Sequence, residues 1–452
     1  MAEKLWSKGF ATAERIEAFT VGRDRDMDLY LAKYDALGSM AHTTMLQTIG
    51  LIGRDELPAL LAELRNIYDL CEKGDFAIEE GVEDVHSQIE LMLTGKLGEM
   101  GKKIHSGRSR NDQVLLDLKL FIRQKIKEVC LSAKELFDAL VEQSEKHKGV
   151  LMPGYTHLQV ATPSSFGLWF GAHAESLADD MLFMLAAYRM ANRNPLGSAA
   201  GYGSSFPLDR QMTTDLLGFD SMAYNSVYAQ MGRGKTERNT AYAMASVAAT
   251  VAKMAYDACL FNSQNFAFVR LPKECTTGSS IMPHKKNPDV FELIRARCNR
   301  LQALPQQVAM ITNNLPTGYF RDLQEIKEVF LPAFDQLIDC IGMATYIVGR
   351  MEVDSNILDN PMYAPMFSVE EVNRRAAAGT PFRDAYKQVG LEIEAGTFRA
   401  DTRVEHTHAG SIGNLCNGRI RELMENTLAE FRFEKAEAAE ERLLAAAGRA
   451  GS

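Results

Sequence analysis

The stretch NDQVLLDLKLFIRQKIKEVCLSAKELFDALVEQSEKHKG, residues 111–149, contains no proline and has no glycine before its last residue. Its apolar residues recur every three or four positions, as at Val114, Leu118, Ile122 and Ile126, which is the spacing of one face of an α-helix. Proline inside a helix costs roughly 3 kcal/mol, so its absence permits a helix of unusual length. We therefore predict one long helix across this stretch.

Three further stretches carry a helical signature. Residues 237–261 are rich in alanine and apolar nearly all round, as expected of a helix buried inside a bundle. Residues 290–312 and 326–351 are also helix-like, and alternating strand patterns are almost absent. The sequence predicts an all-α protein with a central bundle of long helices. Loose boundaries near residues 107 and 350 give an N-terminal helical domain, a central helical-bundle domain and a C-terminal helical domain, at 1–107, 108–350 and 351–452.

Composition restricts the kind of partner. The 452 residues are 46% hydrophobic and 24% charged, with a formal net charge of -9, which argues against nucleic acid or an anionic membrane as the main partner. An anionic small molecule could still bind in a local basic pocket. Seven cysteines without C-x-x-C spacing predict neither a disulfide framework nor a zinc site. With no signal peptide and no uncharged apolar run long enough to span a bilayer, we expect a cytoplasmic protein.

The loop SGRSRNDQV, residues 106–114, precedes the first long helix. Ser109 and Asn111 are residue types that cap helix N-termini. Arg108 and Arg110 are poorly placed there, because the helix dipole already makes this end positive. We expect an anion to accompany them.

Two more loops are richer in polar groups than a turn requires. MPGYTHLQ, residues 152–159, places His157 just after a turn, and TTGSSIMPHKKNPD, residues 276–289, offers Ser279 and Ser280 as candidate nucleophile or base. His157 and His86 are the histidines best suited to acid–base work, because imidazole titrates near neutral pH. The loops contain few carboxylates and no metal-ligand spacing. This inventory suits binding and deprotonating a polycarboxylate without a metal or cofactor.

The segment AQMGRGKT, residues 229–236, nearly fits a phosphate-binding P-loop but has alanine in place of the first glycine. A P-loop follows a buried strand and opens a helix. The preceding FDSMAYNSVY makes a poor strand, so nucleotide binding is a minor hypothesis for this segment.

Taken together, SGRSRNDQV, MPGYTHLQ, NPLGS, GSSIMPHKKNPDVFELIRARCNRL and GYFRDLQEIKE resemble the argininosuccinate lyase family of the fumarase/aspartase superfamily. The resemblance implies three helical domains and a homotetramer whose active sites are assembled from the loops of three subunits. It also implies the reversible β-elimination of argininosuccinate to arginine and fumarate, in arginine biosynthesis, without a cofactor.

The resemblance also implies roles for individual residues. Ser279 would be the base and His157 the acid, although these two roles can be exchanged. Lys285 and Asn287 would hold the reacting carboxylate, and Glu292 would orient His157. The Gly278 loop would close as a lid over the substrate. His86 would contact the substrate-binding residues rather than the substrate itself. The remaining substrate-binding positions are Ser109, Arg110, Asn111, Thr156, Arg233, Tyr319, Gln324 and Lys327.

Two departures from the family pattern raise the question of substrate. Residues 19–39 lack a usual substrate-binding serine, with Asp24 or Gly22 nearest to its place, and Arg233 is flanked by glycines rather than acidic residues. We therefore hypothesise that acidic groups are lost near the arginine end of the substrate, which would favour an N-acylated argininosuccinate.

Two different identities compete with an argininosuccinate lyase. One is another lyase of the superfamily, such as adenylosuccinate lyase, against which the motif GRSRNDQV argues. The second is a catalytically silent protein of the crystallin type, which would be expected to have lost catalytic residues. Ser279, Lys285, Asn287 and His157 are all present, which favours an active enzyme.

Overall fold

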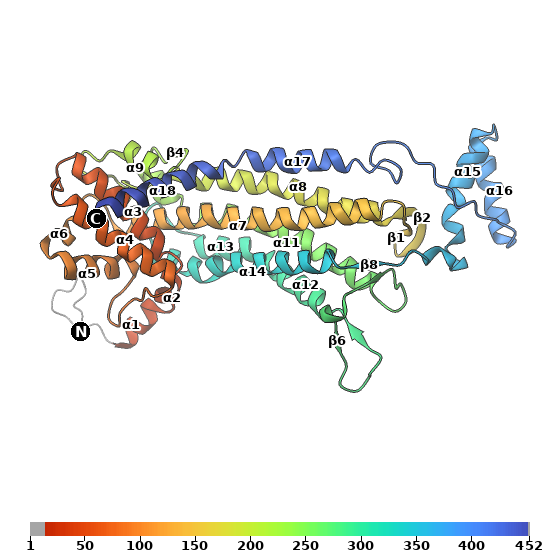
Figure 1. Ribbon diagram of the computed structural model, residues 1–452, viewed down its shortest axis with the longest axis horizontal. Coiled ribbons are helices and arrows are strands. Elements are labelled where there is room, and N and C mark those ends of the chain that lie inside the picture. The colour runs from red at the N-terminus through yellow and green to blue at the C-terminus, as the bar shows by residue number, and fades with distance from the viewer. Residues whose placement is uncertain (1–13, 451–452) are drawn as a thin grey trace.

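The computed structural model describes residues 14–450 as an elongated assembly of helices (Figure 1). The all-α fold class is confirmed, since the strands are few and short. We expected no signal peptide at the N-terminus. Residues 1–13 lie outside the described part of the chain, so this expectation stays a prediction.

The predicted long helix is α7, Arg110–Lys146, which has 37 residues. At a rise of 1.5 Å per residue it is about 55 Å long. Its start is fixed by a capping box, in which the Ser109 side chain accepts from the helix backbone and the Asp112 carboxylate accepts from Ser109 N at 2.8 Å. Such reciprocal bonds satisfy amide groups that a helix leaves unpaired at its N-terminus.

α7 and three other long helices form the central bundle (Figure 1). α7 packs against α8, Phe166–Ala191, and α14, Glu325–Val348, while α11, Lys235–Phe261, packs against α8 and α14. Phe121 of α7 meets Phe334 of α14 edge to face, with ring centroids 5.6 Å apart. The core is therefore continuous from one helix to the next.

The stretch 290–312 departs from expectation, because it forms two helices rather than one. α12, Asp289–Leu301, ends before α13, Leu304–Thr312, in which Pro305 is one of the first two residues. Proline fits the first turn of a helix, where its missing N–H is not needed, but would break an interior. Pro332 does lie inside α14, which continues through it.

Helices from both ends of the chain gather at the N-terminal end of α7 (Figure 1). α18 packs against α4 and α3, and α17 runs back along α8. The helices that precede α7 are α1, Glu14–Val21; α2, Asp24–Asp28; α3, Ala32–Thr48; α4, Leu57–Lys73; α5, Val85–Leu97; and α6, Glu99–Lys102. α9, Arg210–Leu216, and α10, Ser226–Met231, come between α8 and α11 in sequence, and α17, Asn417–Ala429, and α18, Phe433–Ala450, come last.

α15, Ser368–Ala377, and α16, Phe382–Glu394, form a small unit at the opposite end (Figure 1). Val372, Ala385 and Val389 make a core there that is separate from the main one. The main core includes residues from Met27 to Ala447. The three-domain division near residues 107 and 350 stays a prediction.

The strands pair two by two. β1, Leu151–Thr156, and β2, Gln159–Ser165, form an antiparallel hairpin that the sequence did not reveal. The short pairs are β3, Arg193–Asn194, with β4, Ser221–Met222; β5, Val269–Arg270, with β8, Glu352–Val353; and β6, Thr277–Gly278, with β7, Lys286–Asn287. No strand leads directly into residues 229–236, the first three of which belong to α10. The requirement for a P-loop is therefore not met.

Two helices, 235–261 and 321–348, are long and apolar enough by composition to cross a membrane. Both pack within the helical bundle, and a core helix of a soluble protein passes the same test. All seven cysteines are free.

Candidate active site

A cavity of about 180 Å³ lies beside the N-terminal end of α7. It brings together seven predicted site residues: His86, Arg110, Asn111, Arg233, Tyr319, Gln324 and Lys327. We call this the N-terminal pocket. The rest of its lining consists of Asp24, Asp28, Glu83, Asp84, Val114 and Arg321.

Lys327 is held between two carboxylates. Its Nζ donates to Asp28 Oδ1 at 2.6 Å and also pairs with Asp24, and the Lys327 side chain is only 5% exposed. Burial alone would lower the pKa of Lys327, but Asp28 and Asp24 outweigh it and raise the pKa. Burial and the neighbouring Asp28 raise the pKa of Asp24 to about 6, against the opposing effect of Lys327. The pocket therefore holds a charged lysine beside a carboxyl group that titrates near neutral pH.

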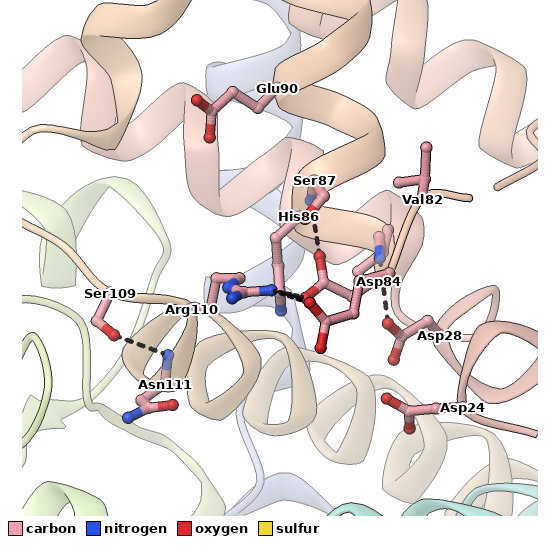
Figure 2. A network of polar contacts seen from close by, with 12 residues as sticks. Asp24, Asp28, Val82, Asp84, His86, Ser87, Glu90, Ser109, Arg110 and Asn111 are labelled. Atoms are coloured by element: carbon pink, nitrogen blue, oxygen red, sulfur yellow. Dashed lines mark hydrogen bonds and ion pairs between the residues drawn. The ribbon is translucent and has the colours of Figure 1, made fainter. Parts of the chain in front are cut away.

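Arg110 obtains its anion from the chain itself. Its Nη1 donates to Asp84 Oδ2 at 2.7 Å and to Glu83 Oε2 at 3.2 Å, as Figure 2 shows for Asp84. Arg108 is buried and donates to Ser39 Oγ at 3.0 Å. Arg110 therefore already has carboxylate partners within the chain, and the expectation that an anion accompanies the two arginines stays a prediction. Internal carboxylates offset the positive charge at this helix start.

His86 lies in a buried cluster with Asp35 and Asp117 (its ring is shown in Figure 2). Its Nδ1 is 3.3 Å from Asp35 Oδ1 and 3.7 Å from Asp117 Oδ2. Burial would lower the pKa of His86, but Asp35, Asp117 and Asp84 outweigh it and raise the pKa to about 9. His86 is therefore an imidazolium at neutral pH, so it supports the pocket rather than removing protons.

The same three side chains are the one group among the described residues with potential metal-ligand atoms within 4.8 Å of one another. A protonated imidazole has no lone pair with which to bind a metal. With His86 protonated, the imidazolium is ion-paired with Asp35 and Asp117 inside the chain. The prediction of a metal-free reaction stays a prediction.

Tyr319 and Arg233 line the pocket side by side. The Arg233 guanidinium lies 5.6 Å from the centroid of the Tyr319 ring, and its Nη2 donates to Leu323 O at 3.2 Å. Gly234 explains one departure from the family pattern, because its φ is +78° and an added Cβ would clash with Thr312 Cγ2. Only glycine fits there without movement.

The β1–β2 hairpin presents His157 at its tip, within the turn rather than after it. His157 and Leu158 both have left-handed backbone, with φ of 55° and 56°. Non-glycine residues in this region are uncommon and cluster at functional sites. Thr156 and His157 are exposed.

The loop between β6 and β7 projects away from the bundle (Figure 1). Ser279 Oγ accepts hydrogen bonds from Ile281 N at 3.3 Å and Met282 N at 3.1 Å. Lys285 is exposed in the same loop. Backbone N–H groups already directed at a hydroxyl oxygen would stabilise negative charge on it. Gly278 has no positive φ, and an added Cβ would meet nothing within 4 Å, so this conformation does not require glycine there.

The fourteen predicted site residues divide between the two ends of the bundle. Ser109 caps α7 beside the N-terminal pocket. Thr156 and His157 follow the far end of α7, and the loop carrying Ser279, Lys285 and Asn287 leaves from that half of the bundle (Figure 1). Glu292 is exposed on α12. Since α7 alone is about 55 Å long, one chain in this conformation does not bring the two groups together.

Comparison with known proteins places this arrangement in a known class. A family model described as "Lyase" matches residues 9–303. Argininosuccinate lyase of Phocaeicola vulgatus is 69% identical over 444 residues, which cover 98% of this chain and 100% of that protein. Argininosuccinate lyase of Thermotoga neapolitana is 37% identical over 86% of this chain and 98% of that one.

Solved structures agree in fold. An EDDS lyase in complex with formate has a TM-score of 0.73 at 21% identity, covering 97% of this chain and 94% of its own. Class II fumarase from Schistosoma mansoni has a TM-score of 0.68 at 16% identity, covering 91% and 95%. The fold and the matching family model define a lyase of the fumarase/aspartase superfamily. At this level of full-length identity, the chain belongs to the argininosuccinate lyase family.

Neither adenylosuccinate nor an N-acylated argininosuccinate is favoured as the substrate by these relatives. The premise of the N-acyl hypothesis also changes, because acidic groups are not missing from the pocket. Asp24, Asp28, Glu83 and Asp84 line it. Asp84 does carry a local sequence signal, since an aspartate before an apolar helical run is a typical N-cap, and its side chain accepts from Ser87 N at 2.8 Å. Asp28 and Glu83 carried no such signal.

Proposed function

We propose that this chain catalyses the reversible β-elimination of argininosuccinate to arginine and fumarate. The observation that carries the proposal is 69% identity to an argininosuccinate lyase along almost the whole of both chains. The test is release of fumarate, followed at 240 nm, from argininosuccinate, adenylosuccinate and N-acetyl- and N-succinyl-argininosuccinate. We expect the highest kcat/KM for argininosuccinate. A higher value for any other substrate would contradict the proposal.

The chemical difficulty is the proton on the carbon beside a carboxylate, which is very weakly acidic. Ser279 takes this proton, and the electron pair of the C–H bond moves into the neighbouring carboxylate to give a dianionic aci-carboxylate. The pair then forms the C=C bond of fumarate as the C–N bond to the guanidine breaks. Lys285 and Asn287 hold the carboxylate on which charge accumulates, because cations and donors fixed there stabilise the transition state more than the ground state.

Ser279 needs help to act as a base, since a free hydroxyl is far too weak. The two backbone N–H groups that donate to its oxygen supply part of this help, and Lys285 supplies the positive charge. His157 delivers a proton to the departing guanidine, and Glu292 from another subunit orients the imidazole in the manner of a carboxylate–histidine pair. Closure of residues 276–289 as a lid brings Ser279 to the substrate and excludes water.

The N-terminal pocket binds the rest of the substrate. Lys327, Gln324 and Tyr319 hold the arginine end, while Ser109, Arg110 and Asn111, joined by Thr156 of another subunit, bind toward the reacting end. Arg233 adds positive charge at the wall, and His86 fixes Asp84, which positions Arg110. The carboxylates of Asp24 and Asp28 offset Lys327 while the pocket is empty.

The separation of the two groups of residues supports a homotetramer with shared active sites. The lid of one chain, residues 276–289, and its β1–β2 hairpin would reach the N-terminal pocket of another chain. The bundle helices also expose large apolar side chains, as an interface requires. These include Leu182 and Phe183 of α8, Tyr242 and Tyr256 of α11, Leu293 of α12, and Met343 and Tyr346 of α14. We propose that the tetramer acts in the cytoplasm.

Mixing two inactive variants tests this sharing directly. Ser279→Ala and Tyr319→Phe/Gln324→Ala chains are denatured together in equal amounts and refolded. If each site draws Ser279 and the pocket from different chains, about a quarter of the sites in randomly mixed oligomers receive both intact groups. Each variant refolded alone is the control. Activity no greater than that of the separate variants would rule out sharing between these two groups.

A further inference from the structure

A second pocket adjoins the N-terminal pocket and shares Arg233 with it. This cavity has a volume of about 270 Å³ and is lined by the end of α10, the start of α11 and the segment that follows α13. Lys235, Arg238, Thr312, Thr317 and Gly318 are among its lining residues. We call it the basic pocket. None of the roles in the proposed reaction uses Lys235 or Arg238.

Two of the three cations of the basic pocket, Lys235 and Arg238, are not paired by the described part of the chain. Arg233, Lys235 and Arg238 line it, and no carboxylate does. Among the described residues neither Lys235 nor Arg238 has an ion pair, and the ammonium of Lys235 rests 5.7 Å from the centroid of the Tyr228 ring. Glu237 lies between them in sequence but is buried, and its carboxylate accepts from Gly234 N at 2.7 Å. By contrast, Lys327 and Arg110 in the N-terminal pocket each have two carboxylate partners.

Arg233 supplies a second, independent feature of a binding site. It is 7% exposed, and its Nε has no hydrogen-bond partner among the described residues. Its guanidinium donates to one backbone carbonyl and lies over an aromatic ring, and it has no direct ion pair among the described residues. The carboxylates of Asp24 and Glu237 interact with its charge only at longer range. A buried charge without a directly paired carboxylate is costly. The N-terminus of α11, a helix of 27 residues, adds positive potential at the same place.

We propose that the basic pocket binds a small oxyanion carrying at least two negative charges, of the carboxylate or phosphate class, and that this site is separate from the substrate pocket but coupled to it through Arg233. An anion bound there lowers the positive electrostatic potential at Arg233, which lines both pockets. Because binding free energies are reciprocal, the anion and the substrate then weaken each other's binding. This inference concerns binding by the free protein and goes beyond the proposed reaction.

Calorimetric titration of the full-length protein with inorganic phosphate, and separately with citrate, tests the site at an ionic strength held constant with NaCl. We expect saturable binding of at least one anion, and the tighter of the two identifies the preferred chemistry. In Lys235→Gln/Arg238→Gln the affinity should fall at least about tenfold, since charge-assisted hydrogen bonds are lost. The matched control, Arg383→Gln/Lys387→Gln, removes two exposed charges from α16 and should bind as the native protein does.

The variant Lys235→Arg/Arg238→Lys keeps both positive charges and should still bind the anion. It therefore shows whether the Gln variant loses binding through the lost charges or through a local change in structure. Equal affinity in the native and Gln-substituted proteins, or no saturable binding of either anion, would overturn the proposal. The calorimetric titration contains no substrate, so its result does not depend on the proposed reaction. If the anion binds but argininosuccinate releases no fumarate, only the proposed reaction is contradicted.

Steady-state kinetics then test the coupling. A saturating concentration of the anion should raise KM for argininosuccinate about fivefold, within the usual range of coupling, and leave kcat unchanged. The rise should disappear in Lys235→Gln/Arg238→Gln. An equal rise in both proteins would mean that the anion competes in the substrate pocket, and would overturn the coupling.

Discussion

The N-terminal pocket and the β6–β7 loop contribute to the same proposed reaction but are built in opposite ways. In the pocket, cations such as Lys327 are buried and already paired with carboxylates. In the loop, Lys285 is exposed and its neighbour Ser279 is held only by two local backbone donors. The pocket is thus part of the folded core of one chain, whereas the loop can gain its partners only on closing against another surface. Changes in the pocket should therefore affect stability and activity together, and changes in the loop activity alone.

The largest expected effect is that of Ser279→Ala. If Ser279 is the base, fumarate release should fall by about ten-thousandfold, the upper end of what general acid–base groups contribute. Thermal unfolding and oligomeric state, measured by calorimetry and light scattering, should not change, because the side chain makes contacts only within its exposed loop. Near-normal turnover in this variant would refute the mechanism.

Two lysine substitutions contrast the regions directly. Lys327→Met leaves Asp24 and Asp28 buried without their cation, and breaking a buried pair in this way costs about 3–5 kcal/mol of unfolding free energy. Both the free energy of unfolding, measured in urea, and kcat/KM should fall. Lys285→Met should lower kcat/KM with no measurable change in the urea midpoint. Equal stability losses in the two variants would abolish the distinction between core and loop.

The buried imidazolium predicts a pH dependence of stability. The pKa of His86 is about 9 in the folded chain against 6.5 for the free side chain. Its contribution is therefore fully present below pH 6.5 and is lost as the pH rises through 9. The shift corresponds to about 3 kcal/mol. Urea unfolding between pH 6 and 10 should show this decline in the native protein and in His284→Gln, an exposed control, but not in His86→Gln.

The smallest effect concerns the cap of α7. Ser109→Ala should cost about 1 kcal/mol of stability and also raise KM, because Ser109 is proposed to bind substrate. Ser165 caps α8 in the same manner, with its hydroxyl accepting from Leu168 N at 3.1 Å. Ser165→Ala should match the loss in stability and leave KM unchanged. An unchanged KM in both variants would remove Ser109 from the substrate site.

The sequence predicted the long helices well, because their apolar spacing is a local property. It missed the β1–β2 hairpin, whose strands contain Pro153 and Pro163 and lack a clear alternation. It grouped the site residues by resemblance but could not show that His157 and Lys327 lie at opposite ends of the bundle. It also missed Asp28 and Glu83, since nothing local marks a carboxylate whose partner is remote in sequence, as Lys327 and Arg110 are.

The length of α7 has an evolutionary consequence. An inserted residue in the middle of this helix would turn everything beyond it by about 100° and shift it by 1.5 Å. In the proposed tetramer each copy repeats the error, so every active site loses its register at once. We therefore expect length variation among relatives to be confined to loops and to the ends of the chain, with α7 kept at a constant number of residues.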